Sequence, residues 1–450
     1  MSKKIFAAAA LFVCATMGGA AADDASDLGG RLTPVGAERA GNAAGTIPAW
    51  DSGLATPPAG YKPGGDYVDP YASDAKLFSI DKSNLDRYKD NLTAGQRAIF
   101  ARFPDYRMDV YPTHRSCALP KSNYEKTKQN VGVAKLDPAT WDLVGAVPGG
   151  LPFPLPQNGA EAMWNHRLAF EGIGRNVSGT SAVVNAAGSF VPQKWEEVRL
   201  SNYYNPANTT FDALQNIQLK YFTIYTEPAR LAGEEYLVHE TLNGERNAWI
   251  YSPGLRRVRR APTLAYDNPS SGYEGLATND QLYMFNGRLD RYDWKLVGKK
   301  ELYVPYNNFA FASSSHRVKE LVKDNFTNRD LMRYELHRVW VVDATLKQGI
   351  RHMLPHRVFY IDEDSWRILA TDIYDGHGNV WRYQEETTVP VYDVPTCFSF
   401  GETFYDFQTG RYILDLAYND DKRPDFHAET NGGATDDMFT VGYLRKRGTR

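Results

Sequence analysis

The chain has 450 residues, and its 51 Lys and Arg side chains against 54 Asp and Glu give a formal net charge of −3 at pH 7. Because the charge is so nearly balanced, the composition gives no reason to expect nucleic acid or a strongly anionic membrane as the main partner. The chain also contains 9 Trp, 28 Tyr and 21 Phe residues, which is ample apolar material for the core of one large domain or of two.

The first 22 residues have the three-part layout of a secretory signal peptide. Two lysines precede an apolar run over residues 5–17, and small residues follow up to Ala22. The apolar run is too short to remain as a membrane anchor. We therefore expect residues 1–22 to be removed before Asp23 and the product to be exported, and we expect no cofactor such as ATP or NAD.

Predicted export bears on all three cysteines. Cys14 lies inside the apolar run, which raises the alternative of a lipid-modified cysteine, but the branched Val13 stands where a lipoprotein peptidase needs a small residue. Cys117 and Cys397 remain after cleavage, in a compartment where disulfides persist. Either they are two separate buried thiols, or they form a bridge worth about 4 to 5 kcal/mol by loop-entropy arguments. We predict the bridge.

The first predicted element of the exported chain is an N-terminal arm. Residues 28–65 are rich in Gly, Pro and Ala without sustained periodicity, which predicts an extended arm over the surface rather than a core element. Apolar residues recur near helical spacing over residues 83–102, and Pro104 ends this predicted helix. We predict that residues 23–110 form an arm and a helical segment, packed as one unit with a domain over residues 111–450.

A second, shorter helix is predicted after Asn158, which is a good N-cap residue. From Phe190 onwards the pattern changes to strands. Strand-like runs over residues 221–260 are joined at Asn243-Gly244, a pair that favours a two-residue type I′ hairpin, and again at residues 252–254.

Another predicted meander covers residues 356–386, with turns at residues 362–364 and 375–378. Neighbouring strands that are joined by tight turns must be antiparallel, because a parallel pair needs a long crossover. The sequence therefore predicts a mainly β protein with one large antiparallel sheet, a few helices and long irregular segments.

One predicted strand, over residues 255–260, carries arginine on both faces. Alternation places Arg257 and Arg259 on one face and Arg256 and Arg260 on the other. A core strand could not bury these charges without paired acids. Two interpretations stay open: a solvated edge strand protected by its charge, or a strand with one face in a cavity where arginine meets an acid or an anionic headgroup.

Most catalytic signatures are absent from the sequence. It has no P-loop, dinucleotide fingerprint, Gly-x-Ser-x-Gly elbow or paired zinc cysteines. His337, His352 and His356 form a local histidine cluster, but Pro355 and strand-like flanks disfavour a metal site, and we predict none. An exported hydrolase with two carboxylates stays open, although no pair of acids is singled out.

Five segments together resemble one protein family, DUF1329, a domain of unknown function in exported Gram-negative proteins that is often labelled outer-membrane lipoprotein-sorting-like. The segments run in the family's order and cover nearly the whole mature chain, so the chain is identified as a member. They are "RLTPVGAERAGNAAGTIPAW" (31–50), "LPFPLPQNGAEAMWNHRL" (151–168), "NAWIYSPGLRRVRRAP" (247–262), "DRYDWKLVGKKELYVPYN" (290–307) and "RVWVVDATLKQGIRHMLPHRVFYIDEDSW" (338–366).

The resemblance implies a LolA/LolB-like fold, a strongly curved, incomplete antiparallel barrel around an apolar cavity with helices as a lid. It also implies a periplasmic carrier or chaperone for a hydrophobic, acyl-bearing ligand such as a lipid, without covalent chemistry of its own. An inner-membrane export pump and an outer-membrane acceptor are the implied partners. Candidate ligand-binding residues are the strand aromatics Trp249, Tyr251, Trp294, Trp340 and Phe359 and the arginines Arg257, Arg259 and Arg260.

Two other classes of function remain as alternatives. One is an exported hydrolase acting on polysaccharide or lipid ester, and the other is a scaffold that docks to an export pump and carries nothing. A deep apolar cavity favours the carrier, a polar cleft with two facing carboxylates favours the hydrolase, and a filled barrel favours the scaffold.

Overall fold

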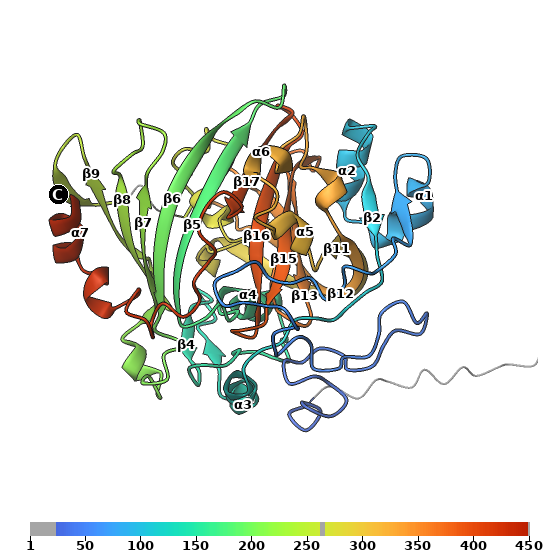
Figure 1. The fold of residues 1–450 in the computed structure, drawn as a ribbon. Helices are drawn as coiled ribbons and strands as arrows, with labels where there is room; N and C mark the ends of the chain where they lie inside the picture. Colours follow the sequence, from blue (N-terminus) through green and yellow to red (C-terminus); the bar gives the residue numbers. More distant parts are fainter. Residues whose placement is uncertain (1–23, 262–265, 449–450) are drawn as a thin grey trace, which may run out of the picture.

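The computed structural model describes residues 24–261 and 266–448 (Figure 1). The predicted signal peptide with its cleavage site and Cys14 lie outside the described residues. Within the described ranges, no helix is long and apolar enough to cross a membrane.

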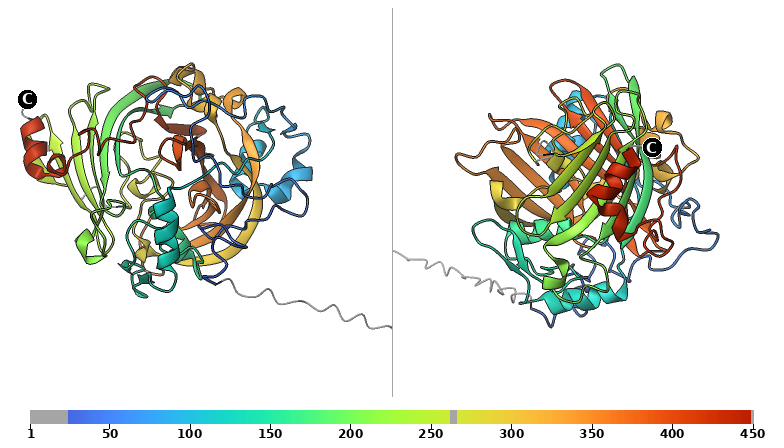
Figure 2. Two further views of the ribbon diagram at one scale, coloured as in Figure 1. Left: turned by 60° about the horizontal axis from the view of Figure 1, so that its bottom comes forward. Right: turned by 90° about the vertical axis from the view of Figure 1, so that its left-hand side faces the viewer.

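One curved, mixed sheet of 15 strands dominates the described chain. Its neighbours are antiparallel apart from one parallel pairing, between Val110 in β2 and Tyr334 in β12. The sheet curls round without closing into a barrel (Figure 2), so the predicted mainly β fold with an open curved sheet is confirmed. Its hydrogen-bonded order is β1-β2-β12-β13-β14-β15-β16-β17-β5-β6-β7-β8-β9-β10, with β11 paired to β12 beside this path.

The strands of this sheet range from short edge strands to long central ones. A separate small hairpin is formed by β3 (Lys135–Leu136) and β4 (Leu143–Gly145). The strands of the large sheet are β1 (Phe78–Ile80), β2 (Met108–Val110), β5 (Gly174–Val184), β6 (Phe190–Ser201), β7 (Ile217–Tyr225), β8 (Glu235–Thr241), β9 (Asn247–Ser252), β10 (Arg257–Arg260), β11 (Tyr292–Pro305), β12 (Tyr334–Leu346), β13 (His356–Asp362), β14 (Ile368–Tyr374), β15 (Val380–Val391), β16 (Thr396–Asp406) and β17 (Arg411–Ala417).

The described helices are short and lie around the sheet (Figure 1). The α-helices are α1 (Leu85–Tyr88), α2 (Ala94–Arg102), α3 (Lys121–Asn130), α4 (Gly159–Arg167), α5 (Phe309–Ala312), α6 (Val318–Leu321) and α7 (Val441–Gly448). The 3₁₀ turns are η1 (Lys89–Asn91), η2 (Asp212–Leu214), η4 (Asn279–Gln281), η5 (Leu289–Arg291), η6 (Arg329–Leu331) and η7 (Asp436–Phe439).

The middle of the sheet is covered on both faces. On the concave face, Trp164 of α4 packs in one apolar cluster with Phe359 of β13. On the convex face, Phe100 of α2 packs in a second cluster with Tyr360, the next residue of the same strand. Because both faces are covered, every position of β16 is buried, and the strand does not show the polar and apolar alternation of a half-exposed strand.

The helix predicted over residues 83–102 is present as three pieces rather than one, namely α1, η1 and α2. The break occurs because Thr93 starts a new helix with a capping box, in which its side chain accepts from the Gln96 amide. Asp372 of β14 strengthens this start by accepting from the Thr93 hydroxyl at 2.8 Å and from the Gly95 amide at 2.8 Å. The predicted end before Pro104 is confirmed, since α2 ends at Arg102.

The shorter predicted helix is confirmed as α4. The Asn158 side chain accepts from the Glu161 amide at 3.0 Å, which is the expected N-cap bond. The helix approaches β11 so closely that a Cβ on Gly159 would lie 2.9 Å from the backbone carbonyl carbon of Trp294. Only glycine fits there, and this close approach fixes where the last residue of α4, Arg167, enters the concave side.

The N-terminal arm has no helix or long strand, as predicted, but it contributes more to the core than an arm over the surface would. Val35 and Ala37 are buried in the concave-face cluster, and the Val35 carbonyl accepts from the Trp366 indole at 3.0 Å. Gly36 has φ +88°, and a Cβ there would lie 1.9 Å from the Pro154 carbonyl oxygen. The domain boundaries themselves stay a prediction.

The predicted strand connections are largely present. The β13-β14-β15 meander follows the predicted ranges. The β9-β10 hairpin is present, but its turn covers residues 253–256, so β10 begins at Arg257 rather than at residue 255 and Arg256 lies in the turn with φ +49° instead of on a strand face. The β8-β9 hairpin is also present, but residues 242–246 join its strands, so a two-residue type I′ turn at Asn243-Gly244 is wrong. The longer loop allows the Gly244 amide to donate to Asp142 at 3.2 Å, which connects the hairpin to the segment before β4.

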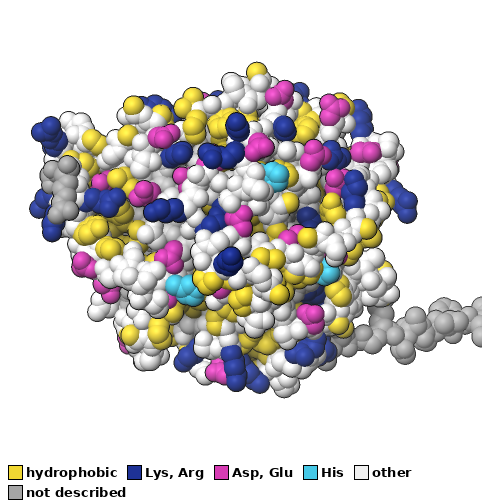
Figure 3. All heavy atoms as spheres, viewed as in Figure 1, with side chains coloured by type: hydrophobic (Ala, Val, Ile, Leu, Met, Phe, Trp, Pro, Cys, Tyr) yellow, Lys and Arg dark blue, Asp and Glu magenta, His cyan; other side chains and the backbone are white. Residues whose placement is uncertain are grey.

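Cys117 and Cys397 form the predicted disulfide, with their Cα atoms 5.4 Å apart. The bridge joins the segment before α3 to β16, 280 residues away in the sequence. Acidic and basic side chains are interspersed over most of the face shown in Figure 3, as the balanced composition implies.

Candidate ligand-binding cavity

A cavity of about 170 Å³ lies against the inner face of β6, β7 and β8. Its other walls are the segment that leaves α4, residues 168–172, and the irregular segment over residues 270–286. Alternation along the three strands selects most of the side chains that line it, because every second residue points to the same face, and the irregularity between Ile217 and Leu219 accounts for the neighbours Gln218 and Leu219. The strand residues in its wall are Trp195, Glu197, Arg199 and Ser201 of β6, Gln218, Leu219, Tyr221, Thr223 and Tyr225 of β7, and Tyr236, Val238 and Glu240 of β8.

Aromatic rings form much of the wall. Tyr221, Tyr225 and Tyr236 stand side by side on neighbouring strands, and Tyr225 and Tyr236 meet edge to face at 5.9 Å between ring centroids. Tyr283 and Phe285 approach from the segment opposite the sheet. A wall of this kind offers apolar ring faces together with hydroxyl groups, so it suits an amphipathic ligand.

A network of ion pairs closes one side of the cavity. Glu171 accepts from Arg199 at 2.6 Å, from Arg175 at 2.9 Å and from Arg367 at 2.6 Å. Burial raises the pKa of Glu171, but the three arginines outweigh it and hold this pKa well below its ordinary range. The carboxylate is therefore ionised and committed to these partners.

The two other glutamates of the wall are also engaged. Glu197 accepts from Arg175 at 2.9 Å and from the Tyr283 hydroxyl at 2.9 Å. Glu240 pairs with Arg246 at 3.0 Å. Asp415 accepts from the Tyr273 hydroxyl at 2.6 Å, and its burial raises its pKa. Each cavity-lining acid thus has a partner within the fold.

His166 of α4 is neutral. Burial and the nearby Arg367 lower the pKa of His166 to about 4. Its Nε2 lies 3.1 Å from the Tyr283 and Phe285 carbonyl oxygens, and its Nδ1 accepts from the Ile368 amide at 3.2 Å. The imidazole therefore holds the 283–285 wall against β14 and is not free for proton transfer.

Arg167, the last residue of α4, lines the cavity beside His166. Its Nη2 donates to Gln218 Oε1 at 3.2 Å and to the Thr241 carbonyl at 3.3 Å. Its guanidinium carbon lies 4.3 Å from the Trp164 ring centroid. Burial lowers the pKa of Arg167.

None of the eight residues predicted from the sequence is in the wall of this cavity. Trp249 and Tyr251 of β9 share the opposite face of the sheet with Leu237, because Leu237 and Trp249 are register partners. Tyr251 packs there against Leu444 of α7 in a small apolar cluster. Their assignment to ligand binding stays a prediction.

Three of the predicted aromatics lie along β11, β12 and β13. Trp294 and Phe359 are buried and contact Phe285, with ring centroids 5.5 Å apart in each case, so they form a layer behind the cavity wall. Trp340 is only partly buried, stacks on Trp366 at 6.0 Å and has Lys299 over its ring at 4.7 Å.

Arg257, Arg259 and Arg260 are exposed on β10, the last strand of the sheet path. Arg259 pairs in register with Ile250, on the face that carries Tyr236, whereas Arg260 stands over the Trp249 ring on the other face at 5.6 Å. Arginine is thus present on both faces, as predicted, and the strand has the features of a solvated edge strand protected by charge.

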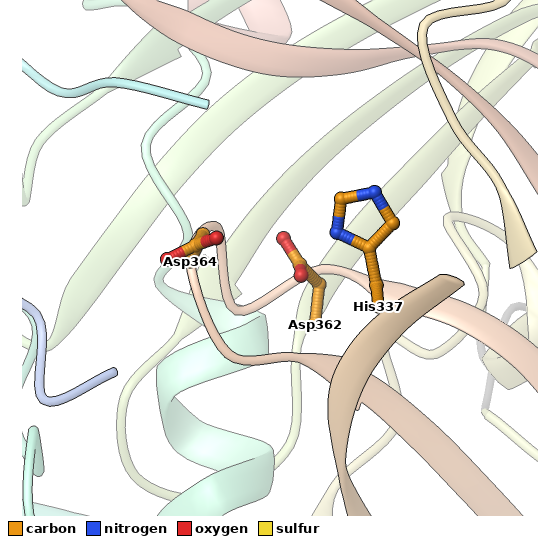
Figure 4. A group of neighbouring side chains, drawn as sticks. All are labelled: His337, Asp362 and Asp364. Carbon is orange, nitrogen blue, oxygen red and sulfur yellow. The ribbon is translucent and has the colours of Figure 1, made fainter. Parts of the chain in front are cut away.

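A second polar cluster is buried beneath the arm and consists of His337, Asp362 and Asp364 (Figure 4). Each residue offers one ligand atom, and these atoms lie within 4.8 Å of one another. However, Arg115 already binds Asp364 with two nitrogens, at 2.8 and 2.7 Å, and Asp362 accepts from the Tyr306 hydroxyl at 3.0 Å. A cation would have to share carboxylates that the fold already uses, so we assign no metal to this cluster.

The wall residues between Tyr221 and Glu240 lie in a predicted strand run, but no sequence pattern singles them out as a site. Alternation groups Tyr221, Thr223 and Tyr225 on one face, yet it does not tell which face of the sheet is concave. A cue was available in Arg167, since a charged residue ends a helix whose other positions are almost all buried.

Curvature, strand order and the cavity define an open-sheet β protein with an internal amphipathic cavity. The chain matches the family model described as "Protein of unknown function (DUF1329)" over residues 79–445 and belongs to this family, which confirms the resemblance seen in the sequence. The uncharacterized protein PA3922 of Pseudomonas aeruginosa is 43% identical to it over 455 residues, which cover 98% of this chain and 97% of that protein.

Several solved structures are similar at low identity. A putative outer membrane lipoprotein-sorting protein domain from Vibrio parahaemolyticus is 16% identical, with a TM-score of 0.44 over 64% of this chain and 98% of that one. A DUF1329 family protein from Desulfovibrio piger is 14% identical, with a TM-score of 0.42 over 64% and 97%. A LolA superfamily protein from Nitrosomonas europaea is 13% identical, with a TM-score of 0.38 over 64% and 100%. We draw no functional argument from likenesses at these scores.

Proposed function

We propose that this protein is a soluble periplasmic carrier of a hydrophobic, acyl-bearing ligand, whose apolar part enters the cavity against β6, β7 and β8. The observation that carries the proposal is the cavity itself, which tyrosine and phenylalanine rings line together with charged side chains on the inner face of an open, curved sheet. Burial of apolar surface supplies the affinity, at about 25 cal/mol per Å².

The size of the cavity limits what it holds in this conformation. A dry cavity of about 150 Å³ in another protein binds benzene, so about 170 Å³ accommodates one ring or the end of an acyl chain. The rest of a long chain would lie outside the cavity, or the walls would have to part. We therefore propose a ligand with a short or flexible apolar group rather than one enclosed along its whole length.

The charged residues of the wall support a carrier over a hydrolase. A glycosidase needs two carboxyl groups that are free to act as acid and as base or nucleophile. Glu171, Glu197 and Glu240 are instead held by arginines. The ion pairs shape the cavity, and no pair of free carboxyl groups faces it among the described residues. An export pump and an outer-membrane acceptor are the proposed partners in the handover of the ligand.

Two matched variants on β7 test the proposal. Thr223 lines the cavity and Ile224, the next residue, points to the other face. T223W places an indole in the cavity and should weaken binding of a fluorescent fatty-acid probe to the delipidated protein at least tenfold, whereas I224W should leave the affinity unchanged. Thermal unfolding of both variants verifies that they fold.

The carrier proposal would be wrong if the folded, delipidated wild-type protein showed no saturable binding of short-chain or long-chain probes. The pump scaffold would then become the better hypothesis. Equal affinities of T223W and wild type would place the binding site elsewhere, with the eight residues predicted from the sequence as the next candidates.

A further inference from the structure

The cavity contains one arginine without an acidic partner. In the described part of the chain, no carboxylate lies within 4.0 Å of the Arg167 guanidinium, whereas Arg199 pairs with Glu171 and Arg246 pairs with Glu240. Burial lowers the pKa of Arg167 and two acids oppose this from a greater distance, but Glu240 is engaged by Arg246 at 3.0 Å and Asp142 by Arg288 at 2.6 Å. Arg167 thus differs from the other arginines of the wall.

Arg167 is half-buried, and an unpaired cation in such a position is costly to the fold. Partial removal of a guanidinium from water disfavours its charged form, and a charge inside a protein is ordinarily paired. The carbonyl end of α4 and the Trp164 ring offset part of this cost, since helix C-termini and aromatic faces attract cations. Neither supplies a full negative charge, so the remaining cost needs a reason.

The fold holds the Arg167 side chain in place. Gln218 binds both parts of Arg167: its Nε2 donates to the Arg167 backbone carbonyl at 2.7 Å, and its Oε1 accepts from the side-chain Nη2 at 3.2 Å. Gln218 is itself buried, at 6% exposure. The Thr241 carbonyl accepts from the same Nη2. Among the described residues nothing accepts a hydrogen bond from Nε or Nη1, so N–H groups of both atoms stay available, whereas Nη2 is engaged.

We propose that the ligand carries an anionic group, a carboxylate or a phosphate, which accepts from the unengaged N–H groups of Arg167. This inference rests on the proposed carrier function and names the polar end of its ligand. A hydrogen bond from a charged guanidinium N–H to an anionic oxygen is stronger than one to a neutral acceptor, so the free N–H groups favour a carboxylate or a phosphate over a neutral polar group. The apolar part of the same ligand lies against Tyr221, Tyr225 and Phe285, so one cavity binds both ends of an anionic amphiphile.

The experiment compares a fluorescent fatty acid with the corresponding fatty alcohol, which has the same chain without the charge. Wild type should bind the acid at least tenfold more tightly than the alcohol, and this preference should weaken as salt is raised. R167Q should bind the two alike, and R167K should recover part of the preference. R259Q, at an exposed arginine of β10, is the matched control and should keep the full preference.

Stability of the empty protein separates a ligand-binding role from a structural one. Because Arg167 has no acidic partner, R167Q should leave the thermal unfolding temperature unchanged or raise it. A structural role predicts that the same variant unfolds at a clearly lower temperature and that R167Q loses acid and alcohol binding alike, and this pair of results would overturn the inference.

Each of the remaining outcomes tests one of the two proposals. If wild type binds acid and alcohol equally, the inference that the ligand carries an anionic group is wrong while the carrier proposal stands. If neither probe binds but inorganic phosphate binds in an Arg167-dependent manner, the anion is a small free ion and the carrier proposal fails. If the probes bind and phosphate or acetate alone does not compete, the anion belongs to the headgroup of a lipid-like ligand. No binding of any of these by folded protein would remove both proposals.

Discussion

Glu171 and Arg175 form an ion pair across one short stretch of chain, with 2.9 Å between Oε2 and Nη1, where the segment after α4 enters β5. The same carboxylate also holds Arg199 of β6 and Arg367 of the β13-β14 turn. One side chain thereby joins the cavity wall to the covered middle of the sheet. Removing its charge leaves three buried guanidinium groups with one anion fewer.

The E171Q variant should therefore be strongly destabilised, by about 3 to 5 kcal/mol, which is typical when one partner of a buried ion pair is lost. Urea unfolding measures this difference. E125Q is the control, because Glu125 is exposed and only 3.9 Å from Lys121 in an exposed helical pair, and it should change stability by less than about 0.5 kcal/mol. Equal stabilities of E171Q and E125Q would show that the network does not support the fold.

The raised pKa of Asp362 predicts a specific pH dependence of stability. Burial and the nearby Asp364 raise its pKa from 3.8 to about 6 in the folded protein. The folded state therefore binds this proton more tightly than the unfolded state. The resulting stabilisation is fully present below about pH 4 and is lost as the pH rises through about 6, to a total of about 3 kcal/mol.

The D362N variant keeps a neutral side chain at every pH and should lose less stability than wild type between pH 5 and pH 8. Urea unfolding at the two pH values measures the difference. D212N, at an exposed position, should follow wild type. A D362N protein with the same pH dependence as wild type would show that Asp362 does not titrate in this range.

The Cys117–Cys397 disulfide should contribute strongly to stability, because it closes a long loop in the unfolded chain. Loop-entropy arguments give up to about 5 kcal/mol. The C117S/C397S variant and the reduced wild type should therefore unfold at the same, lower urea concentration. Peptide mapping without reduction should recover the two cysteine peptides linked, and alkylation of both thiols in unreduced protein would contradict the bridge.

Export can be tested on the mature protein. Cleavage of the predicted signal peptide gives a chain that begins at Asp23, and the intact mass of protein isolated from the periplasm should match it. A retained and acylated Cys14 would instead increase the mass by the lipid and place the protein on a membrane. That result would overturn the picture of a soluble carrier.

Much of the fold could be predicted from the sequence, because features such as helix ends depend on residues that are close in the sequence. Asn158 and Pro104 mark helix ends by their own hydrogen-bonding and steric properties, and the cysteine pair follows from the chemistry of the compartment. The break at Thr93 was missed, because Asp372, almost 280 residues further along the chain, helps to start the new helix there.

The site was much harder to predict than the fold. Alternation correctly places Trp249 and Tyr251 on one face of β9, but the choice between concave and convex faces depends on how the whole sheet curves. Tyr225 and Trp249 are equally plausible as wall residues in the sequence. Only the three-dimensional structure shows that they lie on opposite faces.

The last prediction uses this difference between the two faces. Trp249 meets His239 edge to face at 5.2 Å and lies under Arg260, on the face away from the cavity. W249E should therefore leave the affinity for a fatty-acid probe unchanged, while the loss of its packing should destabilise the protein by about 1 to 3 kcal/mol. Probe titration and urea unfolding of the same preparation measure both effects. A W249E protein of wild-type stability that no longer bound the probe would move the binding site to β9, as the sequence first indicated, and away from the inner face of β6, β7 and β8.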